Sequence, residues 1–301
     1  MQLNEIRKEE QFQAELLNLI ETLKNIAASH YHMMEKEKER FDRFMDAFSE
    51  FFRVVNLVDI DDPLVRVESD RLGIIVVTSD SGFMGGLNQG VIREAANVQG
   101  DRPDEKTALI VIGDKGATVL GDAGREFKFF PGINQDTMYE QSVEIKDYIV
   151  GEALEKRIGK TVIVYPRPLS FTSQTIETAS LLPCAELFDI ESTSEVSQRI
   201  KHEGVIADAT KLIVESSFSD MLEYLAGVWL TSKFFEVFED SKLAEFSARA
   251  MHLEGSFDKV EKEYKKIKHM AQKASRENID KGMRESFGAT RKKRRRKKAP
   301  A

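Results

Sequence analysis

The sequence predicts an α/β fold in which a long antiparallel coiled coil of the N- and C-terminal helices carries an inserted Rossmann-like domain with a mainly parallel sheet. Three observations lead to this prediction. Apolar residues near each end of the chain recur at alternating spacings of three and four, which is the pattern of a coiled-coil seam. The two seams match in character. Between them, short β-branched runs alternate with helical stretches, which is typical of a parallel sheet.

The N-terminal helix is expected within residues 1–60. Asp61-Asp62-Pro63 should end it, because proline disfavours the helical conformation in the residue before it. Lys38 fills one position of an otherwise apolar seam. The seam residues are Leu16, Ile20, Leu23, Ala27, Tyr31, Met34, Phe41, Met45, Phe48, Phe52 and Val55.

The inserted domain is expected at residues 70–203. Apolar runs too short for helices predict buried strands, and each is followed by a helical stretch or a glycine-rich turn. Residues 172–178 alternate polar and apolar side chains, as an edge or hairpin strand would. The predicted strands are 72–78, 108–112, 127–130 and 161–165, and the clearest helices end near residue 99 and span 143–157.

The C-terminal helix is expected at residues 207–289, where no proline interrupts the seam. A helix of this extent would be about 120 Å long and could not bury its seam alone. The N-terminal helix is the expected partner. The seam residues are Leu243, Phe246, Ala250, Leu253, Phe257, Val260, Tyr264, Ile267, Ala271 and Ala274.

The last segment, residues 290–301, is expected to be a disordered basic tail beyond a helix that ends near Phe287-Gly288. Residues 291–298 are eight consecutive basic residues, although the formal net charge of the chain is −7. Like charges repel one another and need counter-charge before they order. The tail could contact nucleic acid or an acidic partner surface, but no aromatic residues are interleaved for base stacking.

The sequence offers little to support catalysis, cofactor binding or a metal site. The glycines of residues 82–86 follow a strand but match neither the P-loop nor the dinucleotide fingerprint, so they are better explained by a tight strand-to-helix turn with close packing. The five histidines lack metal-ligand spacing. Cys184 is the single cysteine, and we expect it to be a small buried apolar residue.

Residues near the N-terminus, among them Glu5, Glu9 and Glu10, are too acidic for a signal or transit peptide. No apolar run approaches the length of a membrane span. A cytoplasmic or matrix-side protein is therefore expected.

Four motifs resemble those of the gamma subunit of F-type ATP synthases. Residues 79–88 read S-D-S-G-F-M-G-G-L-N, similar to the family signature S-D-R-G-L-C-G-G-L-N. Residues 111–116 resemble V-I-G-x-K-G and residues 26–29 resemble V-A-A-S. Residues 273–280 are similar to K-A-R-Q-x-x-I-T. The order and positions of the four motifs agree across the chain to about Ala289.

The chain also departs from these motifs. Ser81 and Met84 stand where the family has arginine and cysteine. His30 stands where it has lysine, and Ser275 and Arg276 stand where it has arginine and glutamine. A basic extension follows where the family has an apolar end. The resemblance is thus to a divergent member of the family.

The resemblance implies a central-stalk rotor subunit without catalytic residues or cofactors of its own, which takes part in ATP synthesis and hydrogen ion transport. Its terminal helices would form a shaft inside the ring of alpha and beta subunits. Its inserted domain would lie on the membrane c-ring beside the epsilon subunit, at the cytoplasmic face of the bacterial inner membrane. The implied shaft contacts are Ile26, Ala27, Ala28, Ser29, His30, Lys273, Ala274, Ser275, Arg276, Asn278 and Ile279, and the signature-loop residues are Asp80, Gly82, Gly85, Gly86 and Asn88.

Two alternatives come from other classes of protein. A coiled-coil adaptor would bind nucleic acid or an acidic partner through the basic tail, and its binding would depend strongly on salt. A nucleotide-binding enzyme would use the glycine loop, and the isolated chain would bind ATP saturably.

Overall fold

The computed structural model describes residues 3–55, 69–184 and 218–297. The predicted helix end at Asp61-Asp62-Pro63, the stretch 185–203 and the predicted helix start at residue 207 lie outside these residues. Contacts within the chain define two compact units. Unit 1 comprises Met1–Ile26 and Ala250–Ala301, and unit 2 comprises Ala27–Arg249.

In unit 1, the beginning of helix α1 (Leu3–Val55) packs against the later part of helix α6 (Phe218–Lys297). Ile6 and Ile267 are buried together in one apolar cluster. Further along α1, the Nζ atom of Lys24 lies 2.7 Å from the Glu254 carboxylate. Later residues of α1 thus lie beside earlier residues of α6, so the two helices run antiparallel. The predicted antiparallel pairing is confirmed.

The predicted seam on α6 is also confirmed. All ten of its residues are buried or half-buried. On α1, Leu16, Ile20, Leu23 and Ala27 are buried or half-buried as well. The three-four alternation therefore identified the faces that the two helices bury.

The predicted helix end near Phe287-Gly288 is wrong, because α6 continues to Lys297 and includes most of the segment predicted to be disordered. Arginine and lysine are good helix formers, and one glycine costs a helix only about 1 kcal/mol. Cations are also favoured near the negative C-terminal end of a helix dipole. These local preferences outweigh the repulsion between the like charges of the basic segment.

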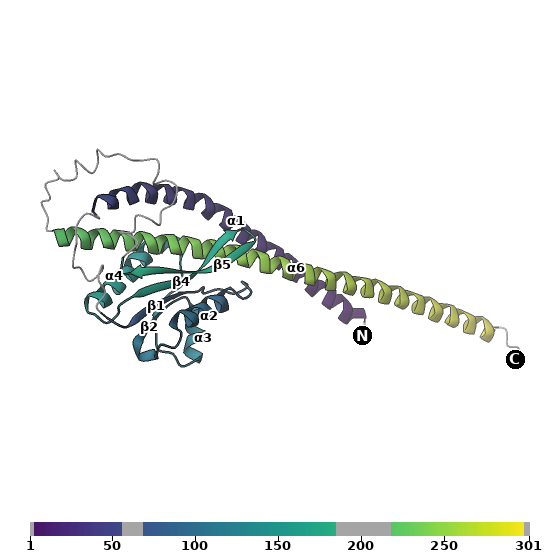
Figure 1. The fold of residues 1–301 in the computed structure, drawn as a ribbon. Helices are drawn as coiled ribbons and strands as arrows, with labels where there is room; N and C mark the ends of the chain where they lie inside the picture. The colour runs from purple at the N-terminus through teal and green to yellow at the C-terminus, as the bar shows by residue number, and fades with distance from the viewer. Residues whose placement is uncertain (1–2, 56–68, 185–217, 298–301) are drawn as a thin grey trace. The chain divides into compact units, whose positions relative to one another are not determined.

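Unit 2 contains a five-stranded sheet in the order β3-β2-β1-β4-β5 (Figure 1). Strands β1 to β4 are parallel where they pair, and β5 is antiparallel to β4. The mainly parallel sheet and its edge hairpin are as predicted. The strands are β1 (Leu72–Val77), β2 (Thr107–Ile112), β3 (Lys128–Phe130), β4 (Thr161–Ser170) and β5 (Ser173–Leu182).

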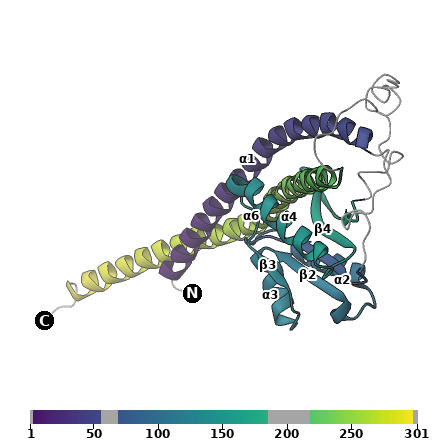
Figure 2. The ribbon, with the colours of Figure 1, turned by 90° about the vertical axis from the view of Figure 1, so that its left-hand side faces the viewer.

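Helices cover both faces of this sheet, as Figures 1 and 2 show. Side chains of a strand alternate between the two faces. Ile74 belongs to a cluster with Val91 of α2, whereas Ile75 belongs to a second cluster with Ile149 of α4 and Phe238 of α6. The helices are α2 (Leu87–Gln99), α3 (Asp114–Asp122) and α4 (Met138–Leu154), with short 3-10 turns at Asp104–Lys106 and Gln135–Thr137.

The C-terminal helix is therefore also part of the core of unit 2. Between residues 229 and 250, α6 is buried or half-buried on every side, because α1 lies on one side and the sheet on another. Cys184 is fully buried in the same cluster, as predicted for a small apolar side chain. Among the described residues, no helix combines the length and hydropathy needed to cross a membrane.

Candidate functional site

The signature loop lies at the carboxyl edge of the parallel sheet, where the predicted residue Asp80 joins three strand ends. Its Oδ1 atom accepts hydrogen bonds from the backbone N–H groups of Asp114 (2.9 Å) and Gly132 (3.1 Å). Asp80 follows β1, Asp114 follows β2 and Gly132 follows β3. One carboxylate thus holds the loops after three neighbouring strands in register.

Asn88 closes the loop from its other end. Its Oδ1 atom accepts a hydrogen bond from the backbone N–H of Ser79 (3.2 Å), and its Nδ2 atom donates one to the Ser79 hydroxyl (3.0 Å). Polar side chains at both ends therefore fix the loop, as their presence in the signature suggests.

The glycines of the loop allow the predicted tight turn between strand and helix, because Gly85 has a positive φ, but Gly82 and Gly86 are not closely packed. A Cβ atom at Gly82 or Gly86 would meet nothing within 4 Å, so the close packing expected there is wrong. Gly85 has a φ of 58° and Phe83 a φ of 65°. Phe83 is exposed, and such a conformation is strained for an aromatic residue.

Close packing occurs instead at the second motif, residues 111–116. A Cβ atom at Gly116 would lie 2.5 Å from the Thr78 hydroxyl, and one at Gly113 would lie 2.3 Å from the Thr78 carbonyl oxygen. The Thr78 hydroxyl donates to the Ile112 carbonyl (2.8 Å) and accepts from the Gly116 N–H (2.9 Å). The two motifs of the α/β domain are therefore packed directly on each other.

Arg249 of α6 connects the signature loop to the C-terminal helix. Its Nε atom donates to the Gly82 carbonyl oxygen (3.4 Å), and its guanidinium lies 2.6 Å from the Glu245 carboxylate. Met84, which replaces the family cysteine, is buried beside it. Sequence analysis missed Arg249 and Glu245, although glutamate four residues before arginine is a recognisable pair on a helix.

The motif at residues 26–30 is divided between core and surface. Ala27 is buried, and the imidazole of His30 packs against Phe246 of α6 with the ring centroids 5.1 Å apart. The Arg249 guanidinium lies 5.9 Å from the centroid of the same Phe246 ring. In unit 2, His30 and the signature loop thus meet on one turn of α6. Ile26 and Ser29 are exposed, and Ala28 is half-buried.

The terminal motif lies elsewhere along α6. Ala274 packs on the cluster around Ile6, and Ser275 is half-buried. Within unit 1, Glu254 pairs with Lys24. Along α6, Glu254 and Ala274 are about 30 Å apart. Lys273, Arg276, Asn278 and Ile279 are exposed.

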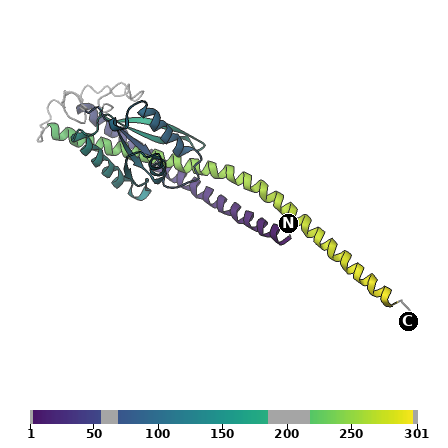
Figure 3. The ribbon, with the colours of Figure 1, turned by 90° about the horizontal axis from the view of Figure 1, so that it is seen from below.

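From Arg276 to Thr290, every residue of α6 is exposed, and the helix extends past the start of α1 (Figure 3). Large apolar side chains recur at four-residue spacing in this stretch. Ile279 is 55% exposed, Met283 56% and Phe287 76%. Residues at this spacing share one side of a helix, so the free end of α6 carries an uncovered apolar face.

Asp240 of α6 is the centre of a buried ion cluster in unit 2. Only 2% of its side chain is exposed; Lys38 of α1 forms an ion pair with it, and the Nε atom of Arg167 lies 3.5 Å away. Burial raises the pKa of Asp240, while Lys38 and Arg167 act in the opposite direction. In the sequence, the place of Lys38 in an otherwise apolar seam is the signal for an acidic residue opposite Lys38.

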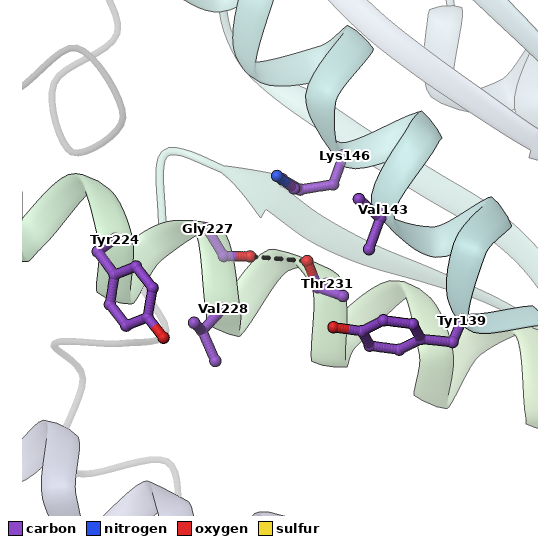
Figure 4. A pocket seen from close by; sticks show the side chains of 7 residues that line it. All are labelled: Tyr139, Val143, Lys146, Tyr224, Gly227, Val228 and Thr231. Carbon is purple, nitrogen blue, oxygen red and sulfur yellow. Dashed lines mark hydrogen bonds between the residues drawn. The ribbon is translucent and has the colours of Figure 1, made fainter.

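A pocket of about 450 Å³ lies between α4 and α6 (Figure 4). The Thr231 hydroxyl donates to the Gly227 carbonyl oxygen (2.9 Å), and Lys146 pairs with Asp147, so these polar groups are engaged within the protein. Tyr139 and Tyr224 flank an open hollow. In the described part of the chain, no group of three or more His, Cys, Asp and Glu side chains is arranged to hold a metal ion.

An antiparallel pair of terminal helices with an α/β domain inserted between them in the sequence defines the fold class of this chain. Comparison with known proteins agrees with this class. The family described as ATP synthase matches residues 2–288. The ATP synthase gamma chain of Desulforudis audaxviator is 27% identical over 206 residues, which are 66% of this chain and 66% of that protein, just under two thirds. The gamma chain of Rhodococcus jostii is 23% identical, over 76% of this chain and 77% of that protein.

The fold matches solved structures as well. A chain of the Euglena gracilis mitochondrial ATP synthase, in a structure of OSCP, F1 and c-ring, has a TM-score of 0.66 at 17% identity, covering 99% of this chain and 97% of that one. A chain of the Tetrahymena thermophila central stalk and c-ring has a TM-score of 0.57 at 17% identity, covering 79% and 99%. Because the family model matches residues 2–288, the chain belongs to this ATP synthase family, and the similar relatives named above are its gamma chains.

Proposed function

We propose that the chain acts as the central-stalk rotor of a rotary F-type ATP synthase or ATPase, coupling ion flow through a membrane ring to nucleotide chemistry on other subunits. The free end of α6 is the observation that carries this role. A helix paired along much of its length and then left uncovered can enter a surrounding sleeve. The pairing stiffens the shaft, and the exposed apolar face can turn against other apolar surfaces without fixed hydrogen bonds.

We infer the specific partners from the places where the motifs lie. Ile279, with Met283 and Phe287 on the same side of α6, would face the ring of alpha and beta subunits. The exposed signature loop and the α/β domain would face the epsilon subunit and the membrane c-ring. In this proposal the subunit works at the cytoplasmic face of a bacterial inner membrane, as a peripheral part of the complex.

Reconstitution tests the role of the free helix end. The chain is combined with alpha and beta subunits, and assembly and ATP hydrolysis are measured. A variant with Ile279→Ser and Met283→Ser should lose most of the stimulation of hydrolysis, because its apolar face is removed. The matched control, Asp280→Ser with Arg284→Ser, changes exposed residues of the same helical turns and should behave like the unmodified chain. Equal activity of both variants would contradict the proposed contact.

A further inference from the structure

The β4–β5 hairpin extends beyond the sheet to which it belongs. Strand β1 pairs with β4 only from Thr161 to Val164. From Tyr165 onward, β4 is paired with β5, and this antiparallel ladder continues to Ser170 opposite Ser173. We call the projecting part, residues 166–174, the outer hairpin.

The outer hairpin contacts both long helices within unit 2. Its tip residue, Phe171, lies against α1, with ring centroids 5.0 Å from Tyr31 and 5.7 Å from His32. The His32 ring is stacked nearly parallel to it, at 14°. On α6, the Nε2 atom of Gln174 donates to the Ser247 hydroxyl at 2.8 Å.

An ion chain runs through the same contact. Lys38 of α1 pairs with Asp240 of α6, which also faces Arg167 of β4. Arg167 is held in turn by Glu177 of β5, whose two carboxylate oxygens lie 2.9 and 3.2 Å from its Nη1 atom. Charged groups thus link four elements one after another, namely α1, α6, β4 and β5.

A gain in stability alone is a weak explanation for this row of ion pairs. A buried ion pair often gains no more than an apolar replacement of the same volume would, because two charges must leave water. What a buried pair does provide is a fixed register, because a displaced partner leaves an uncompensated charge. Apolar seams tolerate small sliding movements, whereas Asp240 and its partners resist them.

We propose that the outer hairpin is a clasp that transmits torque between the helix pair and the sheet. The inference rests on the proposed rotor function and adds the element that passes the load. When the helix pair turns, apolar contacts alone would resist its slip against the α/β domain weakly, and the hydrogen bond of Arg249 to Gly82 is a directional contact outside the clasp. Directional contacts of the clasp to α1 and to α6 prevent this slip.

The test uses the complete complex in vesicles, with ATP hydrolysis and ATP-driven ion transport measured in the same sample. A variant with Arg167→Ala, Phe171→Ala and Gln174→Ala opens the clasp and leaves the buried strands of the sheet unchanged. Hydrolysis should persist while transport per ATP is lost. The control, Arg157→Ala, removes an exposed arginine that pairs with Glu152 and Glu155 in the same domain, and it should match the unmodified complex. Unchanged transport per ATP in the triple variant would overturn the proposal.

A second variant covers the case in which the triple variant fails to assemble. Gln174→Cys with Ser247→Cys allows the clasp to be closed by an added oxidant and reopened by a reductant, while the buried Cys184 stays in place. A clasp that remains shut during rotation predicts equal hydrolysis and equal transport in both states. Loss of transport on closure would show that the hairpin must move, which excludes a load-bearing contact. If the unmodified chain itself supports no ATP-driven transport, the proposed rotor function fails and not the clasp.

Discussion

The carboxylate of Asp240 gives the stability of unit 2 a defined dependence on pH. Burial raises its pKa above the usual 3.8, against the opposing effect of Lys38 and Arg167. The folded state therefore holds this proton more tightly than the unfolded state. The corresponding stability is fully present below pH 3.8 and is lost as the pH rises through the pKa of the folded state.

The variant Asp240→Asn lacks this titration and isolates it. We expect the free energy of unfolding of the natural chain to fall relative to that of the variant as the pH rises above 3.8, and then to run parallel. Denaturant unfolding of both chains over a series of pH values measures the difference. A difference that stays constant, or that moves in the opposite direction, would contradict the raised pKa.

Two glycines of helix α3 make a matched pair for the packing between motifs. Gly116→Ala should destabilise unit 2 by about 1–3 kcal/mol, because its Cβ would collide with Thr78. Gly121→Ala meets nothing within 4 Å and should instead stabilise by about 0.5–1 kcal/mol through helix propensity. Thermal unfolding of the two variants should therefore shift in opposite directions.

Sequence reasoning reached some of these residues and not others for physical reasons. Asp80 and Asn88 were found because a motif marked them. Arg249 and Asp240 were missed because the local signals, the spacing of Glu245 and Arg249 and the place of Lys38 in the seam, do not say which distant elements these residues contact. The wrong packing assigned to Gly82 shows the same limit, since the space around a Cβ atom is a tertiary property.

At the scale of elements, the helix pair offers a test of the seam. Ile267→Asp would place a charge in the buried cluster with Ile6 and should cost several kcal/mol, on the order of the penalty for a buried unpaired charge. Met270→Asp is the control, because Met270 is 48% exposed on the same helix. Circular dichroism during heating should show early loss of helix in the first variant only.

The elements themselves were largely predictable. The parallel strands follow from short apolar runs and the seam from side-chain periodicity, and both patterns report local burial directly. The end of α6 was not predictable, because helix propensity, the helix dipole and charge repulsion compete there with similar magnitudes. The predicted domain limits at residues 60, 203 and 207 stay predictions, since they fall outside the described residues.

Helix α6 continues to Lys297 and so includes most of the basic segment. The role of this basic end in the assembled complex stays a prediction. Desolvating several unpaired charges inside a sleeve would cost several kcal/mol for each, so we expect this end to emerge into solvent. Truncation after Ala289 should then leave assembly and hydrolysis nearly intact. If the shortened chain no longer assembles, the basic end is a binding element.

For the whole molecule, the rotor function makes a simple prediction about chemistry. The isolated chain should hydrolyse no ATP, because its sequence lacks a P-loop lysine, a metal-binding carboxylate placed after one and a water-orienting base identifiable from spacing. Its effect should appear only after alpha and beta subunits are added. Turnover by the isolated chain that survives repeated purification would contradict the assignment.

The antiparallel pairing also determines when the chain can complete its fold. Ile6 and Lys24 leave the ribosome long before their partners Ile267 and Glu254 are made. Contacts between distant parts of a sequence form late, and apolar surface that waits for them is prone to aggregate. The nascent α1 must therefore carry an unshielded apolar stripe until α6 has been made. We expect the newly made chain to depend on a chaperone that covers such a stripe until α6 arrives.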